Sequence, residues 1–160
     1  MSPIRLLYVD DDADTCAIVT SFCERIGTFT IKTLDSGESA LVWLAASTAD
    51  VIVSGYHIHG GIDGMNLLRT LRARGDTTPF IFFSAIEEAA VRKEACHEGA
   101  FGFISKNATG KIPIYQLIRT IFWAVNNALP ARTDRTVCGN TAPDTPDPGY
   151  LLRALQHARK

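Results

Sequence analysis

The sequence lacks the features that would direct it to a membrane or to nucleic acid. Its 160 residues carry a formal net charge of −1, so no global field draws the protein to nucleic acid or to acidic lipid. The longest apolar runs have the length of a β-strand, which is too short to cross a bilayer. The N-terminus enters such a run without the apolar stretch of a secretory signal. We therefore expect a cytoplasmic protein with no nucleic-acid or membrane partner.

Cysteine is scarce and lacks the spacing of a metal or redox motif. The four cysteines, Cys16, Cys23, Cys96 and Cys138, include no Cys-x-x-Cys pair, the spacing typical of zinc and redox sites. They could form disulfides, but thiols in a reducing cytosol usually stay reduced. We therefore expect four buried, reduced thiols.

The chain does contain a regular alternation of strand-like and helix-like segments. An apolar fraction of 46% and a charged fraction of 21% are typical of a globular domain. Short runs of apolar, β-branched and aromatic residues predict strands. They lie at residues 4–9, 29–33, 51–54, 80–83 and 101–104. The segments that follow them carry apolar residues at helical spacing.

This alternation predicts the fold. Strand–helix units repeated along a chain form right-handed crossovers and a parallel sheet covered on both faces. With five strands, we expect an α/β, flavodoxin-like (βα)5 doubly wound fold with strand order 2-1-3-4-5. Its functional crevice lies where the first and third strands end. Asp10, Asp11 and Asp12 follow the first strand, and Gly55 follows the third.

Local signals predict where the first helices begin and end. Asp12 or Asp14 can cap the first helix, and Ser36 can cap the second, because their side chains accept hydrogen bonds from unpaired backbone N–H groups. Gly27 is suited to end the first helix, since glycine adopts the left-handed conformation of a helix C-terminus.

The composition changes after residue 129, which divides the chain into three parts. We expect a domain over residues 1–129, a proline-rich linker over 130–149 and a short C-terminal helix or tail over 150–160. Residues 130–160 carry five basic and three acidic side chains. The tail could dock on its own domain, bind a partner or fray, and the sequence leaves these alternatives open.

Several stretches, in order, resemble one known family. They lie at residues 6–12, 50–57, 61–64, 65–69, 79–85 and 99–106. As an ordered set they are similar to the receiver domains of two-component response regulators, the CheY-like family. The resemblance covers residues 4–128, about four-fifths of the chain.

The resemblance implies a phosphoryl-transfer site. In the family, the acidic pair matched by Asp10 and Asp11 holds Mg²⁺, which prefers oxygen ligands. An aspartate at the end of the third strand ligates the same ion and becomes phosphorylated. The hydroxyl matched by Ser84 and the ammonium matched by Lys106 contact the phosphoryl group. The aromatic residue matched by Phe103 turns inward with that hydroxyl as a switch.

Three departures from the family pattern bear on this site. Gly55 occupies the acceptor position and carries no nucleophile. Asn107 replaces the proline that usually follows the lysine, so the usual cis peptide is not expected there. The segment 58–61 is one residue longer than usual. We therefore expect a looser loop, in which His57 could still lend a backbone carbonyl to a weakened Mg²⁺ site.

Simpler roles compete with each of these assignments. Lys106 could form a standing ion pair with Asp10 or Asp11 and mimic one fixed signalling state. His57 and His59 could bind a metal or accept phosphate, but loop histidines are usually solvated. Ser84 lacks a neighbouring base that would make it a substitute acceptor. Phe103 could be a plain core aromatic instead of a switch.

An interaction face is expected on the fourth helix, the last strand and the fifth helix. Apolar residues wrap around more than one side of the fifth helix, which suggests a partner or a dimer. They are Tyr115, Ile118, Phe122 and Trp123. The partner would be a kinase, a downstream effector or a second copy; alternatively, residues 150–155 cover this face.

The leading hypothesis is a pseudo-receiver, a non-enzymatic domain that is not phosphorylated on aspartate and signals by protein–protein contact. An alternative is a haloacid-dehalogenase-like phosphatase that uses Asp10 and Asp12. That family also needs a late acidic pair, and the late aspartates here lie in the proline-rich segment. A DNA-binding regulator is disfavoured because no second domain fits after residue 129.

Overall fold

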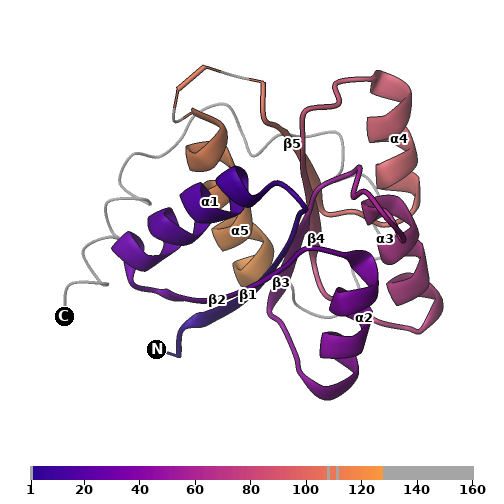
Figure 1. The fold of residues 1–160 in the computed structure, drawn as a ribbon, viewed down its shortest axis with the longest axis horizontal. Coiled ribbons are helices and arrows are strands. Elements are labelled where there is room, and N and C mark those ends of the chain that lie inside the picture. Colours follow the sequence, from indigo (N-terminus) through magenta and orange to yellow (C-terminus); the bar gives the residue numbers. More distant parts are fainter. Residues whose placement is uncertain (1, 108, 111, 128–160) are drawn as a thin grey trace.

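The computed structural model describes residues 2–107, 109–110 and 112–127. Strands and helices alternate along this part of the chain (Figure 1). The strands are β1 (Ile4–Val9), β2 (Phe29–Leu34), β3 (Val51–Ser54), β4 (Phe80–Ser84) and β5 (Gly102–Ser105). The helices are α1 (Ala13–Ile26), α2 (Gly37–Ala46), α3 (Gly64–Ala73), α4 (Ala89–His97) and α5 (Ile112–Asn127).

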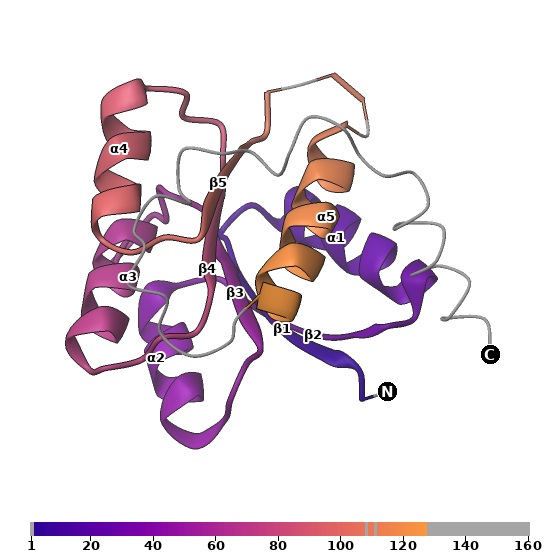
Figure 2. The same cartoon turned by 180° about the vertical axis from the view of Figure 1, so that it is seen from behind.

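All strand pairs are parallel, and the sheet order is β2-β1-β3-β4-β5. The predicted α/β, flavodoxin-like fold is therefore confirmed. Helices α1 and α5 cover one face of the sheet, and α2, α3 and α4 cover the other (Figure 1, Figure 2). Every residue of β3 and β4 is buried, as expected for central strands packed on both faces.

Two apolar clusters, one on each face of the sheet, form the core. The cluster beneath α1 and α5 includes Val19, Cys23 and Leu117. The cluster on the opposite face includes Leu67 and Leu68 from α3 and Phe80 and Phe82 from β4. Burial of these side chains stabilises the sheet and leaves its carboxyl-terminal edge, where the loops emerge, for polar groups.

The predicted helix ends are present in the structure. The Asp12 carboxylate accepts hydrogen bonds from the backbone N–H groups of Asp14 and Thr15 and caps α1. Gly27 ends α1 with a φ of 74°, a conformation that glycine adopts without a Cβ penalty. Ser36 caps α2 by accepting from the backbone N–H of Ser39.

One sequence expectation needs correction, and others concern residues outside the described part of the chain. Cys16 and Cys23 are free thiols, but Cys96 is disulfide-bonded, so the expectation of a reduced thiol is wrong there. Sequence spacing identifies local motifs and does not show which distant side chains meet. The predictions for residues 130–149 and 150–160 fall outside the described residues. In the described part of the chain, no helix has both the length and the apolar character needed to cross a membrane.

Candidate functional site

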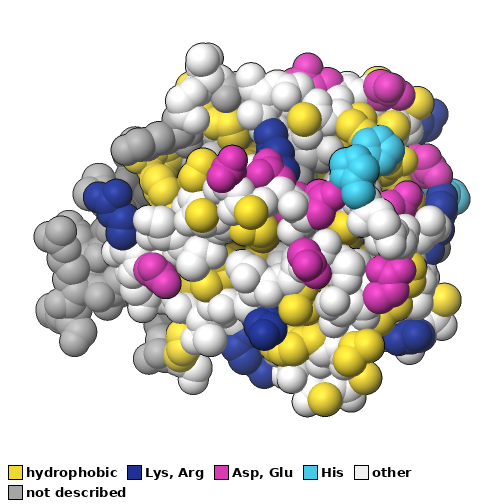
Figure 3. Space-filling model, viewed as in Figure 1, with side chains coloured by type: hydrophobic (Ala, Val, Ile, Leu, Met, Phe, Trp, Pro, Cys, Tyr) yellow, Lys and Arg dark blue, Asp and Glu magenta, His cyan; other side chains and the backbone are white. Residues whose placement is uncertain are grey.

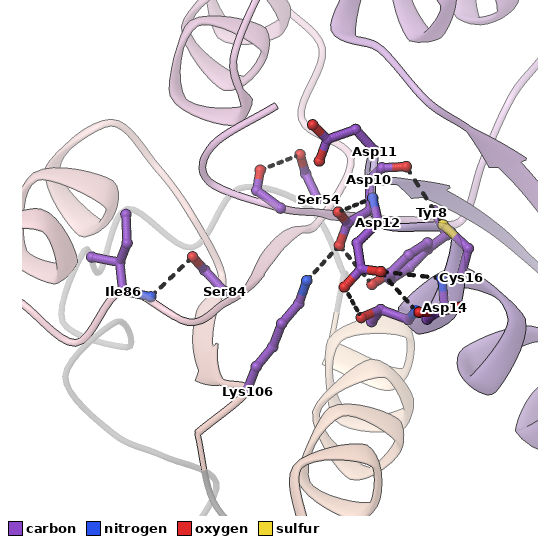
Figure 4. Close-up of polar contacts among 12 residues, drawn as sticks. Tyr8, Asp10, Asp11, Asp12, Asp14, Cys16, Ser54, Ser84, Ile86 and Lys106 are labelled. Atoms are coloured by element: carbon purple, nitrogen blue, oxygen red, sulfur yellow. Dashed lines mark hydrogen bonds and ion pairs between the residues drawn. The ribbon is translucent and has the colours of Figure 1, made fainter. Parts of the chain in front are cut away.

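The carboxyl ends of the central strands bring the predicted site residues to one edge of the sheet. Asp10 follows β1, Gly55 follows β3, Ser84 ends β4 and Lys106 follows β5. The register aligns these ends, since Val9 lies opposite Ser54 in the pairing of β1 with β3. Figure 4 shows Asp10 and Lys106 pointing toward each other across this edge. Parallel strands end on the same side, which is why residues far apart in the chain meet here.

Asp10 is the best buried carboxylate of the site, with 3% of its surface exposed. Its Oδ2 accepts hydrogen bonds from Lys106 Nζ at 2.6 Å and from the Tyr8 hydroxyl at 3.1 Å. Its Oδ1 accepts from the backbone N–H of Asp12 at 3.0 Å. Both oxygens of this buried carboxylate are therefore hydrogen-bonded inside the protein, as burial of a charge requires.

The contact with Lys106 is a buried ion pair. Only 2% of the Asp10 side chain and 20% of the Lys106 side chain are exposed. The standing ion pair that the sequence raised as an alternative is thus the arrangement in the structure, with Asp10 as the partner. The Lys106 ammonium also lies 5.4 Å from the centre of the Phe83 ring, a favourable position for a cation.

Tyr8 is a site residue that the sequence interpretation missed. Burial, and then the charge and hydrogen bond of Asp10, raise the pKa of Tyr8, so its hydroxyl remains a donor to Asp10. Side chains two residues apart on a strand point to the same face. An aromatic residue with a polar tip two positions before a functional aspartate was therefore a usable signal.

Asp11 is held by His59, a residue that the sequence assigns to a solvated loop. The Asp11 Oδ2 accepts from the backbone N–H of His59 at 2.9 Å, and the His59 Nδ1 lies 2.6 Å from the same oxygen. These contacts, with the backbone hydrogen bond contributing most, lower the pKa of Asp11. His57 points its exposed side chain elsewhere, with its ring against Tyr56.

The loop between β3 and α3 is hydrogen-bonded to α2 and to its own base, and its looseness stays a prediction. The backbone N–H of Ile62 donates to Glu38 of α2 at 2.8 Å, and the N–H of Gly64 donates to the Tyr56 carbonyl at 2.9 Å. Gly60 turns the chain with a φ of 87°. Glycine allows that turn, and the backbone N–H of His59 in the same loop donates to Asp11.

Gly55 is buried at the end of β3, directly beside Asp10. Its backbone N–H donates to the Val9 carbonyl at 2.9 Å, which continues the pairing of β1 with β3. A Cβ built on Gly55 would lie 3.4 Å from the carboxylate oxygens of Asp10. A side chain at this position would therefore point at the Asp10 carboxylate.

The family assignment follows from this arrangement and from sequence comparison. Residues 6–115 match the family model described as the response regulator receiver domain. The chain belongs to this family. The match covers the sheet, the acidic pair and the lysine, so the phosphatase alternative no longer applies, and Asp12 serves as a helix cap.

Relatives of the receiver domain include regulators and a single-domain signalling protein. The chain is 30% identical over 101 residues to the C4-dicarboxylate transport transcriptional regulatory protein DctD of Rhizobium meliloti. That match covers 63% of this chain and 22% of DctD, so the chain spans about a fifth of that regulator. It is 27% identical over 125 residues to the chemotaxis protein CheY of Pseudomonas aeruginosa, covering 77% of this chain and 99% of CheY.

Solved structures show the same fold. The Francisella response regulator 1452 receiver domain aligns with a TM-score of 0.70 at 24% identity. The alignment covers 77% of this chain and 97% of the Francisella domain. The chemotaxis response regulator CheY4 of Vibrio cholerae aligns with a TM-score of 0.66 at 20% identity, over 74% of this chain and 99% of that one.

The two predicted switch residues of the receiver are both buried. Ser84 Oγ accepts from the backbone N–H of Ile86 at 3.2 Å. The Phe103 ring packs 5.5 Å from the Phe82 ring, and the Arg92 guanidinium lies 5.0 Å from the Phe103 ring centre. Arg92 also donates to the Phe103 carbonyl at 3.4 Å. Phe103 therefore occupies the inward position of a core aromatic.

Asn107, which replaces the usual proline, ties together two loops of the receiver. Its side-chain amide donates to the Ala85 carbonyl at 2.7 Å, and its backbone N–H donates to Ser105 Oγ at 3.1 Å. Ser105 in turn donates to Glu87 at 2.7 Å, and this hydrogen bond lowers the pKa of Glu87. No cis peptide bond occurs among the described residues.

The four residues of the predicted interaction face separate in the structure. Ile118 and Phe122 are buried in the core beneath α5. Tyr115 is 49% exposed and makes an edge contact with Phe22 of α1, so it faces the α1 side. Trp123 packs on Phe101, next to β5. Ile118 and Phe122 thus belong to the core, and an interaction role stays a prediction for Tyr115 and Trp123.

The acidic pair does not fit Mg²⁺ in this arrangement. The family implies a magnesium site at Asp10 and Asp11, but no cluster of three or more His, Cys, Asp or Glu side chains suited to a metal occurs among the described residues. The oxygens of Asp10 and the Oδ2 of Asp11 already accept hydrogen bonds from protein donors. Mg²⁺ needs oxygen ligands free to complete an octahedral shell.

Proposed function

We propose that this protein is a pseudo-receiver, which has lost aspartyl phosphorylation and transmits signals by protein–protein contact. Gly55 carries the proposal. It occupies the end of β3, where the family has its acceptor aspartate, and a Cβ placed there would face Asp10. Transfer of a phosphoryl group needs a nucleophilic side chain, and glycine has none.

The neighbouring carboxylates are poor substitutes for the missing acceptor. Asp10 is buried, and two hydrogen-bond donors share its Oδ2. Asp11 accepts two contacts from His59. A carboxylate engaged in this way has its charge offset and its lone pairs directed at donors, which lowers its reactivity as a nucleophile. The proposal therefore includes no enzymatic activity, and any Mg²⁺ affinity is weak.

The ion pair of Asp10 with Lys106 favours one fixed signalling state. In a phosphorylated receiver, the lysine contacts the phosphoryl group, as the resemblance implies. Here Lys106 Nζ lies 2.6 Å from Asp10 Oδ2 and is already paired with a carboxylate of the site. The buried Phe103, covered by Arg92, holds the β5 side of the domain in its inward arrangement. A domain held in one arrangement presents the same surface at all times, which suits a partner that binds it without a phosphorylation signal.

The partner would be a signalling protein, either a kinase or a downstream effector, or a second copy of the chain, and a cytoplasmic location follows from that role. Three of the four large hydrophobic residues that are exposed in the described part of the chain lie on α1 and α5: Ile18, Ile112 and Tyr115. Tyr115 contacts Phe22 of α1, which joins the two helices into one surface. We assign partner contact to this α1–α5 side.

The proposal is tested by treatment with acetyl phosphate and Mg²⁺, followed by intact-mass measurement. We expect no stoichiometric adduct, whereas a phosphorylated aspartate adds about 80 Da. A receiver with an intact acceptor aspartate serves as the positive control. A stoichiometric, hydroxylamine-labile adduct on this chain would show that another carboxylate accepts phosphate and would refute the proposal.

A further inference from the structure

We propose that His59 takes the place of a divalent cation at Asp11, so that both carboxylates of the acidic pair already accept hydrogen bonds from donors of the protein itself. Lys106 donates to Asp10, and His59 contacts Asp11. The inference goes beyond the loss of the acceptor residue, because a receiver without an acceptor aspartate could still bind Mg²⁺ through its acidic pair.

The contact between His59 and Asp11 is a double one. The backbone N–H of His59 lies 2.9 Å from Asp11 Oδ2, and the ring Nδ1 lies 2.6 Å from the same atom. A carboxylate oxygen accepts hydrogen bonds, so the His59 tautomer with its proton on Nδ1 is the one that can donate to Asp11. Figure 3 shows histidine and acidic side chains side by side on this surface.

The longer β3–α3 loop holds His59 in place from both directions. On one side, the Gly64 N–H bonds to the Tyr56 carbonyl and closes the loop at its base. On the other, Glu38 accepts the Ile62 N–H at 2.8 Å. A Cβ on Gly61 would approach that Glu38 carboxylate to 2.2 Å, so the loop packs tightly on α2. A position restrained in this way costs His59 little entropy when it contacts Asp11.

A cation would have to displace these contacts. It would compete with two His59 donors for Asp11 and with Lys106 and Tyr8 for Asp10. Mg²⁺ demands near-ideal geometry and releases its waters reluctantly. The acidic pair also lacks a third carboxylate at residue 55. Removal of His59 should therefore restore part of the affinity for a divalent cation.

Cation titration of matched variants tests this proposal. Mg²⁺, and Mn²⁺ as a paramagnetic probe, are added to the full chain while the amide signals of residues 10–12 and 55 are followed by NMR. The variants are wild type, His59→Ala and His57→Ala. His57 is the control, since it is an exposed histidine of the same loop whose ring lies against Tyr56.

We expect His59→Ala to bind at least tenfold more tightly than wild type, and His57→Ala to behave as wild type. Equal affinity of wild type and His59→Ala would overturn the proposal, and so would an equal gain in both variants. The His59 side chain is 90% exposed, so its replacement leaves the core intact.

A second measurement does not depend on any variant. The imidazole ¹⁵N signals of wild-type His59 should show a protonated Nδ1 bonded to a carboxylate, unchanged by millimolar Mg²⁺. A signal that moves with Mg²⁺ at that concentration would contradict the substitution. Both tests are independent of the acetyl phosphate experiment, because they report cation affinity and not the presence of an acceptor.

Discussion

Lys106 and Asp10 are 96 residues apart in the sequence, and their charged atoms lie 2.6 Å apart in the structure. The pair joins the end of β5 to the end of β1 across the site. Removing one partner of a buried ion pair leaves an uncompensated charge, which is more destabilising than the loss of the pair as a whole.

Lys106→Met should lower the free energy of unfolding by about 2–4 kcal/mol at pH 7, because the buried Asp10 carboxylate then loses its cationic partner. The value is below that of a fully buried pair, since a fifth of the Lys106 side chain is exposed. Urea denaturation measures it. The double variant Asp10→Asn with Lys106→Met should recover much of the loss. A double variant as unstable as the single one would argue against a charge effect.

Tyr8→Phe should reduce stability by about 1.5–3 kcal/mol at pH 7, the range for a hydrogen bond to a charged group. The folded state raises the pKa of Tyr8 from its ordinary value of 10.0. Its contribution is therefore fully present below pH 10 and is lost as the pH rises through the folded pKa. The loss of wild-type stability above pH 10 should be smaller in Tyr8→Phe. Parallel alkaline unfolding curves for both proteins would contradict this prediction.

Gly55→Asp should be destabilising in the absence of a divalent cation. Its Cβ fits, 3.4 Å from the Asp10 oxygens, but the new carboxylate faces Asp10. Two like charges 4 Å apart repel by roughly 4 kcal/mol at an effective dielectric constant of 20. We expect about 2 kcal/mol, because Lys106 offsets part of the repulsion. Thermal unfolding with and without Mg²⁺ measures it, and Gly55→Asn is the uncharged control. Equal losses for both variants would point to packing instead of charge.

Combining Gly55→Asp with His59→Ala should restore a cation site and a nucleophile together. We expect a hydroxylamine-labile adduct with acetyl phosphate in the double variant and little in Gly55→Asp alone, because His59 still holds Asp11. Intact-mass measurement distinguishes the two. Full phosphorylation of Gly55→Asp alone would show that His59 does not obstruct the site.

Gly64→Ala should destabilise the protein by about 3 kcal/mol, at the upper end for overpacking. A Cβ at Gly64 would lie 2.0 Å from the Gly55 carbonyl oxygen, and β3 cannot yield because it is buried on both faces. Gly55→Ala is the matched control, since its Cβ meets atoms only at 3.4 Å. Chemical denaturation compares the two variants, and equal stabilities would show that α3 can shift to admit the methyl group.

Local sequence patterns determined the architecture, the ends of α1, and the strand ends that carry Asp10 and Lys106. Apolar runs of strand length alternate with helical periodicity, and each of these signals depends only on neighbouring residues. Asp12 caps α1 and Gly27 ends it as predicted, because caps and left-handed turns are local chemistry. Once the sheet order is known, Asp10 and Lys106 are expected at the same edge of the sheet, since parallel strands end on one side.

Only the tertiary structure decided the remaining contacts. The hydrogen bonds of His59 to Asp11 and of Tyr8 to Asp10 depend on the path of a loop and on the direction of a side chain. The burial of Ile118 and Phe122 depends on how α5 lies on the sheet. The extra residue between β3 and α3 shows that this loop is longer than usual, but it does not show which part of the protein the loop packs against. Packing against Glu38 on α2 placed His59 beside Asp11, and sequence spacing carries no record of contacts between distant segments.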